Sequence, residues 1–247
     1  MKPMRIAFLA ATAMAASAGL AHANPINVVA YDPTGKSLID FEDAAATAFP
    51  GTVYNGTLTS GGATLSERFA GQVLTSAGDN DVLSGTPTGP LTLQAGAANQ
   101  SLDLGTDNGT HNLIPCGPRG CADPNGYGEG AFAVRFGGGT GYFGFQEFFA
   151  DSPNAVTTLD FFDAAGGLIQ RVTVGTSGSF GFSREGGATD IAGVSVFTGD
   201  LGGLGYDNLL YDGHNGGGVP EPSAWALMIL GCGLAGSAVR RRRAAFA

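Results

Sequence analysis

The sequence is poor in charge, in histidine and in cysteine, and each shortage narrows the functions that it supports. Only 13% of the 247 residues are charged, and the chain has three His, three Cys and a single Trp. Outside the first 23 residues the histidines are His111 and His214, each in a turn-rich or Gly-rich setting that does not favour a catalytic base. No Gly-x-Ser-x-Gly elbow or His-Glu-x-x-His motif occurs. The composition therefore does not favour an enzyme.

Basic residues are scarce in the middle of the chain. Between positions 24 and 218, twenty acidic residues stand against six basic ones, which gives this region a formal net charge of −14. A phosphate backbone would repel such a surface, so we expect no nucleic-acid partner. The remaining basic residues lie near the two ends of the sequence.

Residues 1–23 have the build of a secretory signal peptide. A short basic start precedes an apolar stretch over residues 6–20, and Ala21-His22-Ala23 follows it. Small residues on either side of the histidine fit signal peptidase, so we expect the secretion machinery to export the chain and signal peptidase to cleave after Ala23. A retained anchor helix is the alternative, but the stretch is short and Pro25 follows at once.

The C-terminal region shows a different order of elements. A Gly-rich linker over residues 214–218 is followed by Pro220-Glu221-Pro222 and then by an uncharged stretch over residues 223–239. That stretch is near the lower limit of about 17 residues for a membrane-spanning helix. The basic cluster comes next and consists of Arg240, Arg241, Arg242 and Arg243. Because arginines stay in the cytoplasm, the Pro-Glu-Pro segment is expected on the outer side.

Residues 219–243 resemble a PEP-CTERM sorting domain, on the sequence Val219-Pro220-Glu221-Pro222-Ser223 and the arginine cluster that ends it. The resemblance implies that a membrane-embedded exosortase recognises Pro220, Glu221 and Pro222. It further implies that the exosortase passes the protein from the inner membrane to the cell surface or an extracellular exopolysaccharide matrix of a Gram-negative bacterium. Cys232 stands where an aliphatic or aromatic residue is expected, and residues 244–247 form a short tail. A plain membrane anchor with a chance Pro-Glu-Pro is the alternative.

Residues 24–213 are expected to form one all-β domain. The chain has 42 Gly, and short apolar runs alternate with turn clusters about every 8 to 12 residues. The clearest unit is a hairpin with strands at 155–162 and 168–174 around a five-residue loop. With no amphipathic helix, the pattern predicts an antiparallel β-sandwich of the jelly-roll type. Further strands are expected at 52–58, 64–69, 130–136, 140–149, 179–183, 191–197 and 205–211.

Two cysteines, Cys116 and Cys121, flank a loop rich in turn-forming residues. In the oxidising compartment that export implies, we expect a disulfide between them. A zinc site is the alternative, but the nearby His111 and the two cysteines supply only three of the four ligands of a structural site.

Two segments at opposite ends of the body, residues 38–43 and 203–209, resemble the terminal strands of carbohydrate-binding-module jelly rolls. That resemblance implies a structural Ca²⁺ ion with Glu42 and Asp207 as carboxylate ligands and backbone oxygens completing the shell. A solvated or hydrogen-bonded pair of carboxylates is the alternative.

Carbohydrate binding requires aromatic rings on an exposed surface. The candidates are Tyr127, Tyr142, Phe143, Phe145, Phe148 and Phe149. The period-two spacing of Phe143 and Phe145 favours a core position for both. We therefore predict an exported surface or matrix protein with a structural or carbohydrate-binding role and no required cofactor. The alternative is a secreted polysaccharide hydrolase that uses two carboxylates, Glu129 and Glu147.

Overall fold

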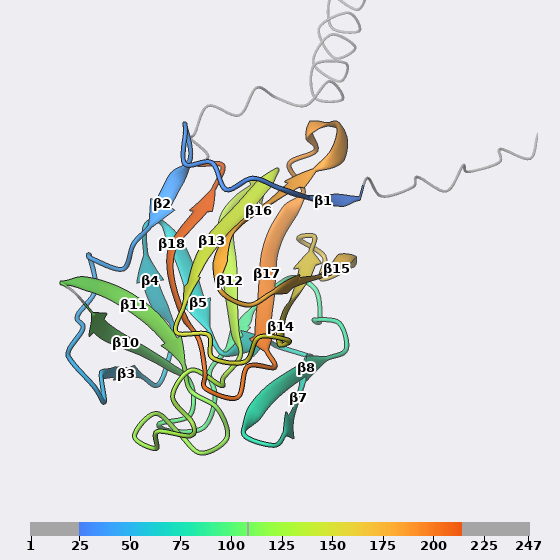
Figure 1. Ribbon diagram of the computed structural model, residues 1–247. Coiled ribbons are helices and arrows are strands. Elements are labelled where there is room, and N and C mark those ends of the chain that lie inside the picture. Colours follow the sequence, from blue (N-terminus) through green and yellow to red (C-terminus); the bar gives the residue numbers. More distant parts are fainter. Residues whose placement is uncertain (1–24, 108, 214–247) are drawn as a thin grey trace, which may run out of the picture.

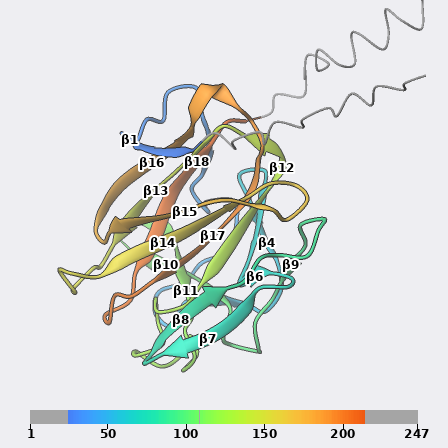
Figure 2. The ribbon, with the colours of Figure 1, turned by 90° about the vertical axis from the view of Figure 1, so that its right-hand side faces the viewer.

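The computed structural model describes residues 25–107 and 109–213, which form two main β-sheets packed face to face (Figures 1 and 2). Neighbouring strands in these sheets pair antiparallel. The predicted all-β class and antiparallel sandwich are thereby confirmed. Among the described residues, no helix is both long and apolar enough to cross a membrane. The predicted signal peptide, linker, membrane-spanning stretch and sorting residues lie outside the described residues.

The larger sheet has eight strands, and the chain crosses back and forth between distant segments to build it. One strand, β2 (Ser37–Ile39), pairs with β18 outside the main strand order. The other strands lie in the order β1 (Ile26–Val29), β16 (Gly178–Arg184), β13 (Tyr142–Phe148), β18 (Gly205–Tyr211), β11 (Thr110–Pro115), β10 (Leu102–Asp107) and β3 (Thr52–Tyr54).

The second sheet has six strands, and two short strand pairs flank the sandwich. The sheet runs in the order β15 (Leu168–Gly175), β14 (Val156–Phe162), β17 (Ile191–Thr198), β12 (Phe132–Thr140), β5 (Ala63–Ser66) and β4 (Leu58–Ser60). The pairs are β6 (Arg68–Phe69) with β9 (Leu93–Gln94), and β7 (Val73–Ala77) with β8 (Asn80–Ser84). The β7–β8 hairpin lies at the lower end of the molecule in Figures 1 and 2. A single 3₁₀ turn, η1, covers Glu185–Gly187.

Phenylalanine rings fill the space between the two sheets. Phe143 of β13 and Phe182 of β16 are fully buried and lie with ring centroids 6.4 Å apart in the larger sheet. Phe161 of the smaller sheet meets Phe182 at 5.5 Å, and Phe132 meets Tyr206 across the sheets at 4.8 Å. Because alternate side chains of a strand point to the same face, this core follows from the period-two spacing of the strands.

The predicted hairpin is confirmed: β14 and β15 pair antiparallel around the expected loop. Val156 pairs with Gly175 and Phe161 with Gln170, and a bulge follows between Phe161 and Phe162. The loop is held by Asp163, whose Oδ1 accepts hydrogen bonds from two backbone N–H groups of the loop. Such a carboxylate turn explains why the chain reverses at this position.

Other strands differ from the prediction in their limits. The run expected over residues 52–58 is two strands, β3 and β4, in different sheets. The segment between them is a turn, where the Asn55-Gly56 sequence favours a change of direction. The pattern also missed the pairs β7–β8 and β10–β11.

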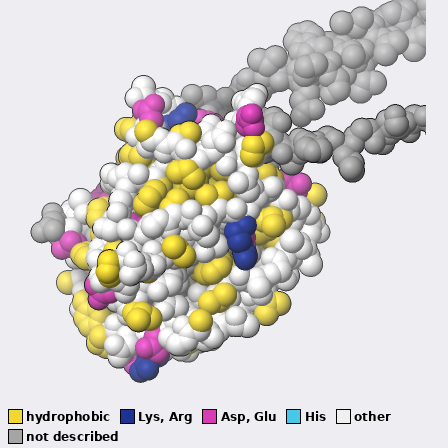
Figure 3. Space-filling model, turned by 45° about the vertical axis from the view of Figure 1, so that its right-hand side comes forward, with side chains coloured by type: hydrophobic (Ala, Val, Ile, Leu, Met, Phe, Trp, Pro, Cys, Tyr) yellow, Lys and Arg dark blue, Asp and Glu magenta, His cyan; other side chains and the backbone are white. Residues whose placement is uncertain are grey.

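Charge is sparse on the visible surface of the sandwich. Figure 3 shows one face, on which hydrophobic side chains are spread among uncharged surface and charged side chains are few. The few charged side chains on this face are in line with the low fraction of charged residues, 13%, in the sequence.

Candidate functional site

Three aromatic rings from separate loops form a cleft at the surface, which we name the aromatic cleft. Its rings are Phe49, Tyr127 and Phe149, and Phe49 and Phe149 are 55% and 54% exposed. Phe49 and Tyr127 meet edge to face with centroids 4.9 Å apart. Two adjoining hollows of about 180 and 260 Å³ share Tyr127, Phe149 and Ile114 in their walls. Exposed rings around a concave surface are typical of a binding site rather than of core packing.

The floor of the aromatic cleft depends on two strand glycines. A Cβ atom at Gly105 of β10 would lie 2.6 Å from the hydroxyl oxygen of Tyr127. A Cβ at Gly205 of β18 would lie 3.1 Å from the ring of Phe149. The absence of side chains at both positions therefore lets the rings lie close against the sheet, beside the buried Ile114.

Phe149 adopts a backbone conformation that a bulky residue rarely takes. Its φ is +68°, in the left-handed region, directly after the end of β13. Such strain costs of order 1 kcal/mol and persists where surrounding structure fixes it, commonly at binding sites. The fold keeps the ring of Phe149 exposed in spite of this backbone strain. That observation favours a role for Phe149 in contacting a ligand.

Polar groups line the same cleft. Thr106 and Asn112 lie on its wall beside the exposed Asp107. Burial and the nearby Asp103 raise the pKa of Tyr127 to about 12, so its hydroxyl stays protonated and able to donate a hydrogen bond. Rings together with a few hydrogen-bonding groups suit a ligand with apolar faces and hydroxyl edges.

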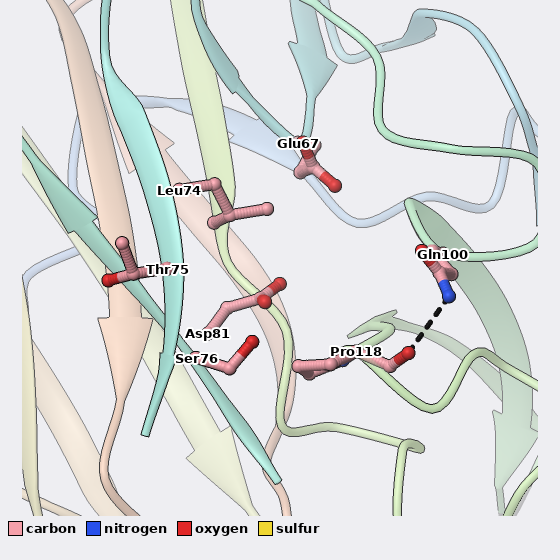
Figure 4. A pocket seen from close by; sticks show the side chains of 8 residues that line it. Glu67, Leu74, Thr75, Ser76, Asp81, Gln100 and Pro118 are labelled. Atoms are coloured by element: carbon pink, nitrogen blue, oxygen red, sulfur yellow. Dashed lines mark hydrogen bonds between the residues drawn. The ribbon is translucent and has the colours of Figure 1, made fainter. Parts of the chain in front are cut away.

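A second cavity, of about 140 Å³, lies between the β7–β8 hairpin and the loop after β11 (Figure 4). Glu67 and Asp81 line it, and Figure 4 shows the carboxylate of Asp81 pointing into the space between Glu67 and Pro118. Burial raises the pKa of Asp81 to about 6. Glu67 is ion-paired with Arg68, and Gln100 donates to the carbonyl of Pro118. Of the two carboxylates in this cavity, Glu67 thus has a counter-charge in Arg68.

The structure brings the two predicted calcium ligands into one region. Asp207 is 5% exposed, and burial together with the charges of Asp40 and Glu42 raises its pKa to about 6. Its Oδ1 accepts a hydrogen bond from the N–H of Asn208, and Glu42 Oε1 accepts one from the N–H of His111. Asp40, Glu42 and Asp207 therefore interact electrostatically, but in the described part of the chain they do not form a group of three ligand atoms within 4.8 Å of one another.

The two cysteines are joined by a disulfide, with Cα atoms 4.9 Å apart and both side chains fully buried. His111 lies elsewhere: its Nδ1 is 3.1 Å from the carbonyl oxygen of Phe41. The acid nearest the disulfide is Asp103, on β10. Burial raises the pKa of Asp103 to about 7, and the N–H groups of Leu104 and Thr52 offset this only in part.

The pair of carboxylates considered for hydrolysis is buried. Glu129 is 1% exposed and Glu147 is 4% exposed, and burial raises the pKa of each to about 7. Glu147 accepts hydrogen bonds from the hydroxyl of Thr157 and the N–H of Ser177. These bonds tie Glu147 of β13 to Thr157 of β14 in the opposite sheet and to the backbone of Ser177, so the geometry assigns Glu147 a structural contact between the sheets.

Sequence reasoning placed some aromatic residues correctly and missed one. Phe143 and Phe145 are fully buried, as their spacing predicts, whereas Tyr127 and Phe149 line the aromatic cleft. Phe49 was missed because it stands alone in a loop before Pro50 and Gly51, with no periodic neighbours. The sequence feature that could have indicated an exposed ring at this position is an isolated aromatic residue directly before Pro-Gly.

The described residues define the class: an antiparallel β-sandwich whose surface carries an aromatic cleft. Residues 218–243 match the PEP-CTERM protein-sorting motif. The chain is a PEP-CTERM domain-containing protein, and this motif indicates that an exosortase processes it and that it is exported to the cell surface or extracellular space. A search of curated proteins found no match to the chain.

Proposed function

We propose that the β-sandwich is a carbohydrate-binding component of the cell surface or of an extracellular polymer matrix, with the aromatic cleft as its glycan-binding surface. The observation that carries this proposal is the exposure of Phe49 and of the strained Phe149 around a hollow with polar walls. Sugar rings present apolar faces and hydroxyl edges, which match aromatic rings and hydrogen-bonding groups.

The charge of the body points to the kind of glycan. With a formal net charge of −14 between residues 24 and 218, the protein would repel a polyanionic polysaccharide at low salt. We expect the cleft to take a neutral polymer. The antiparallel β-sandwich and the resemblance of residues 38–43 and 203–209 to carbohydrate-binding modules are in line with the same proposal.

The sorting tail supplies the route in this proposal. The signal peptide over residues 1–23 directs export, the stretch over 223–239 holds the chain in the inner membrane with Arg240 to Arg243 inside, and exosortase acts near Pro220-Glu221-Pro222. A chain with Glu221→Ala and both prolines changed to Ala is expected to stay unprocessed in the membrane fraction. Normal maturation of that variant would contradict the route.

The binding proposal is tested by screening the full chain, purified in a mild detergent, against an array of neutral and acidic glycans. The wild type is expected to bind neutral glycans, and the double variant Phe49→Ala, Phe149→Asn to lose that binding. Leu168→Ala is the matched control, because Leu168 is an exposed hydrophobic residue of β15. Equal binding by wild type and double variant would overturn the assignment of the cleft.

The second candidate is a hydrolase that uses Glu129 and Glu147. The raised pKa of each, about 7, suits a carboxylic acid that donates a proton, whereas the burial of both side chains and the bonds of Glu147 to Thr157 and Ser177 disfavour it. Incubation with the glycans that bind, followed by measurement of reducing ends, separates the two. Binding without release of sugars supports the binding module, whereas release that Glu147→Gln abolishes supports the hydrolase.

The calcium proposal concerns stability rather than ligand choice. A Ca²⁺ ion held by Glu42 and Asp207 would raise the melting temperature, because ligands that bind only the folded state stabilise it. Asp207→Asn is expected to abolish the increase and to leave the protein folded, since asparagine keeps the size of the side chain. A melting temperature that neither calcium nor a chelator changes would contradict the site.

A further inference from the structure

A carboxylate of β10 and two sulfur atoms meet beneath the loop that follows β11 and carries Tyr127, on the opposite side of β10 from the core residues Leu102 and Leu104. The carboxylate oxygen of Asp103 and the Sγ atoms of Cys116 and Cys121 all lie within 4.8 Å of one another. All three side chains are fully buried. Two sulfur donors and one carboxylate are the ligand types of zinc sites, and the spacing Cys-x₄-Cys is within the range of zinc-binding loops.

Asp103 is only partly compensated in the disulfide form of the protein, by the nearby N–H groups of Leu104 and Thr52. Neither of its carboxylate oxygens has a hydrogen-bond partner of normal geometry. A buried, unpaired carboxyl group is costly, so its position beside the sulfur atoms requires an explanation. The loop before β3 seals it in, because a Cβ atom at Gly51 would lie 2.1 Å from Asp103 Oδ1.

The positions of the two cysteines do not depend on the bond between them. The N–H of Cys116 donates to the carbonyl of Ser101 at 2.8 Å, and the N–H of Cys121 donates to the carbonyl of Asn99 at 2.9 Å. Asp103 is fixed separately by the pairing of β10 with Ile114 of β11. These backbone contacts would keep the three side chains together after the disulfide is opened.

We propose that the dithiol form of this protein binds a divalent cation of the zinc class through Cys116, Cys121 and Asp103, with a water molecule as fourth ligand. Opening the disulfide takes two electrons and two protons. A dithiol reductant supplies both and closes to its own disulfide, whereas a phosphine supplies the electrons and becomes its oxide while water supplies the oxygen and the protons. The cation then displaces both thiol protons and bonds to the two thiolates. The same sulfur atoms serve the disulfide and the metal, so the two states exclude each other.

Because the disulfide and the metal site exclude each other, metal can bind only while Cys116 and Cys121 are reduced. Disulfides form in oxidising compartments, so the dithiol form precedes closure of the bond after export or follows attack by a reductant. Bound metal would protect the thiolates from oxidation and wrong pairing. Asp103 would be a metal ligand in the dithiol state, whereas in the disulfide state its burial is only partly compensated.

Cobalt(II) is the probe, because thiolate ligands give it charge-transfer absorption. The full chain is purified in mild detergent with Cys232→Ser as background, so that Cys116 and Cys121 are its only thiols. It is reduced with a phosphine under anaerobic conditions and titrated with Co²⁺, and then Zn²⁺ is added to displace the cobalt. We expect one equivalent of Co²⁺ with thiolate absorption, full displacement by Zn²⁺, and no absorption from the oxidised protein.

Two variants separate a ligand role from a structural one. Cys116→Ser is expected to abolish the thiolate absorption of the two-sulfur site, and Asp103→Asn to keep it while weakening Co²⁺ affinity at least about tenfold. Far-ultraviolet circular dichroism of each variant checks that the fold is retained, and the near-isosteric Asp103→Asn keeps the test valid if Cys116→Ser unfolds. Reduced protein without thiolate absorption would overturn the proposal. Unchanged affinity in folded Asp103→Asn would remove Asp103 from the site and overturn it as stated.

Discussion

Two groups of aromatic residues in this protein differ in their position: one is buried between the sheets and the other is exposed around the aromatic cleft. Phe143, Phe161 and Phe182 are fully buried between the sheets and contact one another. Phe49 and Phe149 are more than half exposed around the aromatic cleft. The first group lies on strands with regular spacing, and the second lies in loops where Pro, Gly and a left-handed backbone set the position.

This difference teaches that residue type alone does not report function in a sheet protein. A ring on a strand stabilises the sandwich by burying apolar area, whereas a ring in a loop has little area buried in the fold. Substitutions in the two groups should therefore separate stability from binding. The predictions below test that separation from the largest effect to the smallest.

The largest effect is expected from Phe182→Ala in the core. Loss of this ring leaves a cavity beside Phe143 and Phe161, and we expect the free energy of unfolding to fall by about 3 to 5 kcal/mol. Urea unfolding followed by circular dichroism measures it. Phe49→Ala is the matched control and should change stability by less than about 0.5 kcal/mol. Similar losses in both variants would remove the distinction between the two groups.

The buried Glu147 gives a test at the edge of the core. Its folded-state pKa of about 7 lies above the ordinary value of 4.5, so its contribution favours the folded state at low pH and is lost as pH rises toward and through 7. Glu147→Gln does not titrate and still fits Thr157 and Ser177. Relative to the wild type, the variant should gain up to about 3 kcal/mol of unfolding free energy between pH 4.5 and pH 8. If the unfolding free energies of the variant and the wild type changed in parallel with pH, the pKa of Glu147 would not be raised in the folded state.

Phe149→Asn should act on binding and leave stability unchanged or slightly higher. Asparagine tolerates the left-handed backbone at this position, so the strain of the phenylalanine is relieved while the ring is lost. We expect affinity for a neutral glycan to fall about tenfold, equivalent to about 1.4 kcal/mol. Calorimetric titration measures the affinity, and thermal unfolding measures the stability. A destabilised variant with unchanged affinity would place Phe149 in the first group.

The smallest effect is expected from Gly205→Ala in the floor of the cleft. The added methyl group lies 3.1 Å from the ring of Phe149 and must push the exposed ring outward by a few tenths of an ångström. We expect about threefold weaker glycan binding, roughly 0.6 kcal/mol, with little change in stability. The effect should vanish in the Phe149→Asn background, because the ring that the methyl group displaces is absent.

The sequence predicted the sandwich better than it predicted the cleft, for physical reasons. Hairpin β14–β15 and the strands that carry Phe143 and Phe182 have period-two patterns that local sequence contains. Strand β10 was missed because a buried carboxyl, Asp103, interrupts its apolar run. The cleft joins residues 49, 127 and 149, and only the crossing order of the strands brings those loops together.

The calcium prediction used a different kind of information. Two short segments at opposite ends of the body were paired by resemblance, and β2 does pair with β18, with Ile39 opposite Leu209. The pairing of these two strands agrees with the resemblance, whereas calcium binding by Glu42 and Asp207 stays a prediction. The sequence did not indicate that Glu42 accepts a bond from His111, because that contact depends on the position of β11.

The most direct test of the central claim is a titration of the full chain with a soluble neutral oligosaccharide, followed by two-dimensional NMR of assigned aromatic side chains. The account predicts chemical-shift changes confined to Phe49, Tyr127 and Phe149, with the rings of Phe143, Phe161 and Phe182 unchanged. Saturable changes that fall on another surface and leave these three rings unaffected would contradict the assignment of glycan binding to the aromatic cleft.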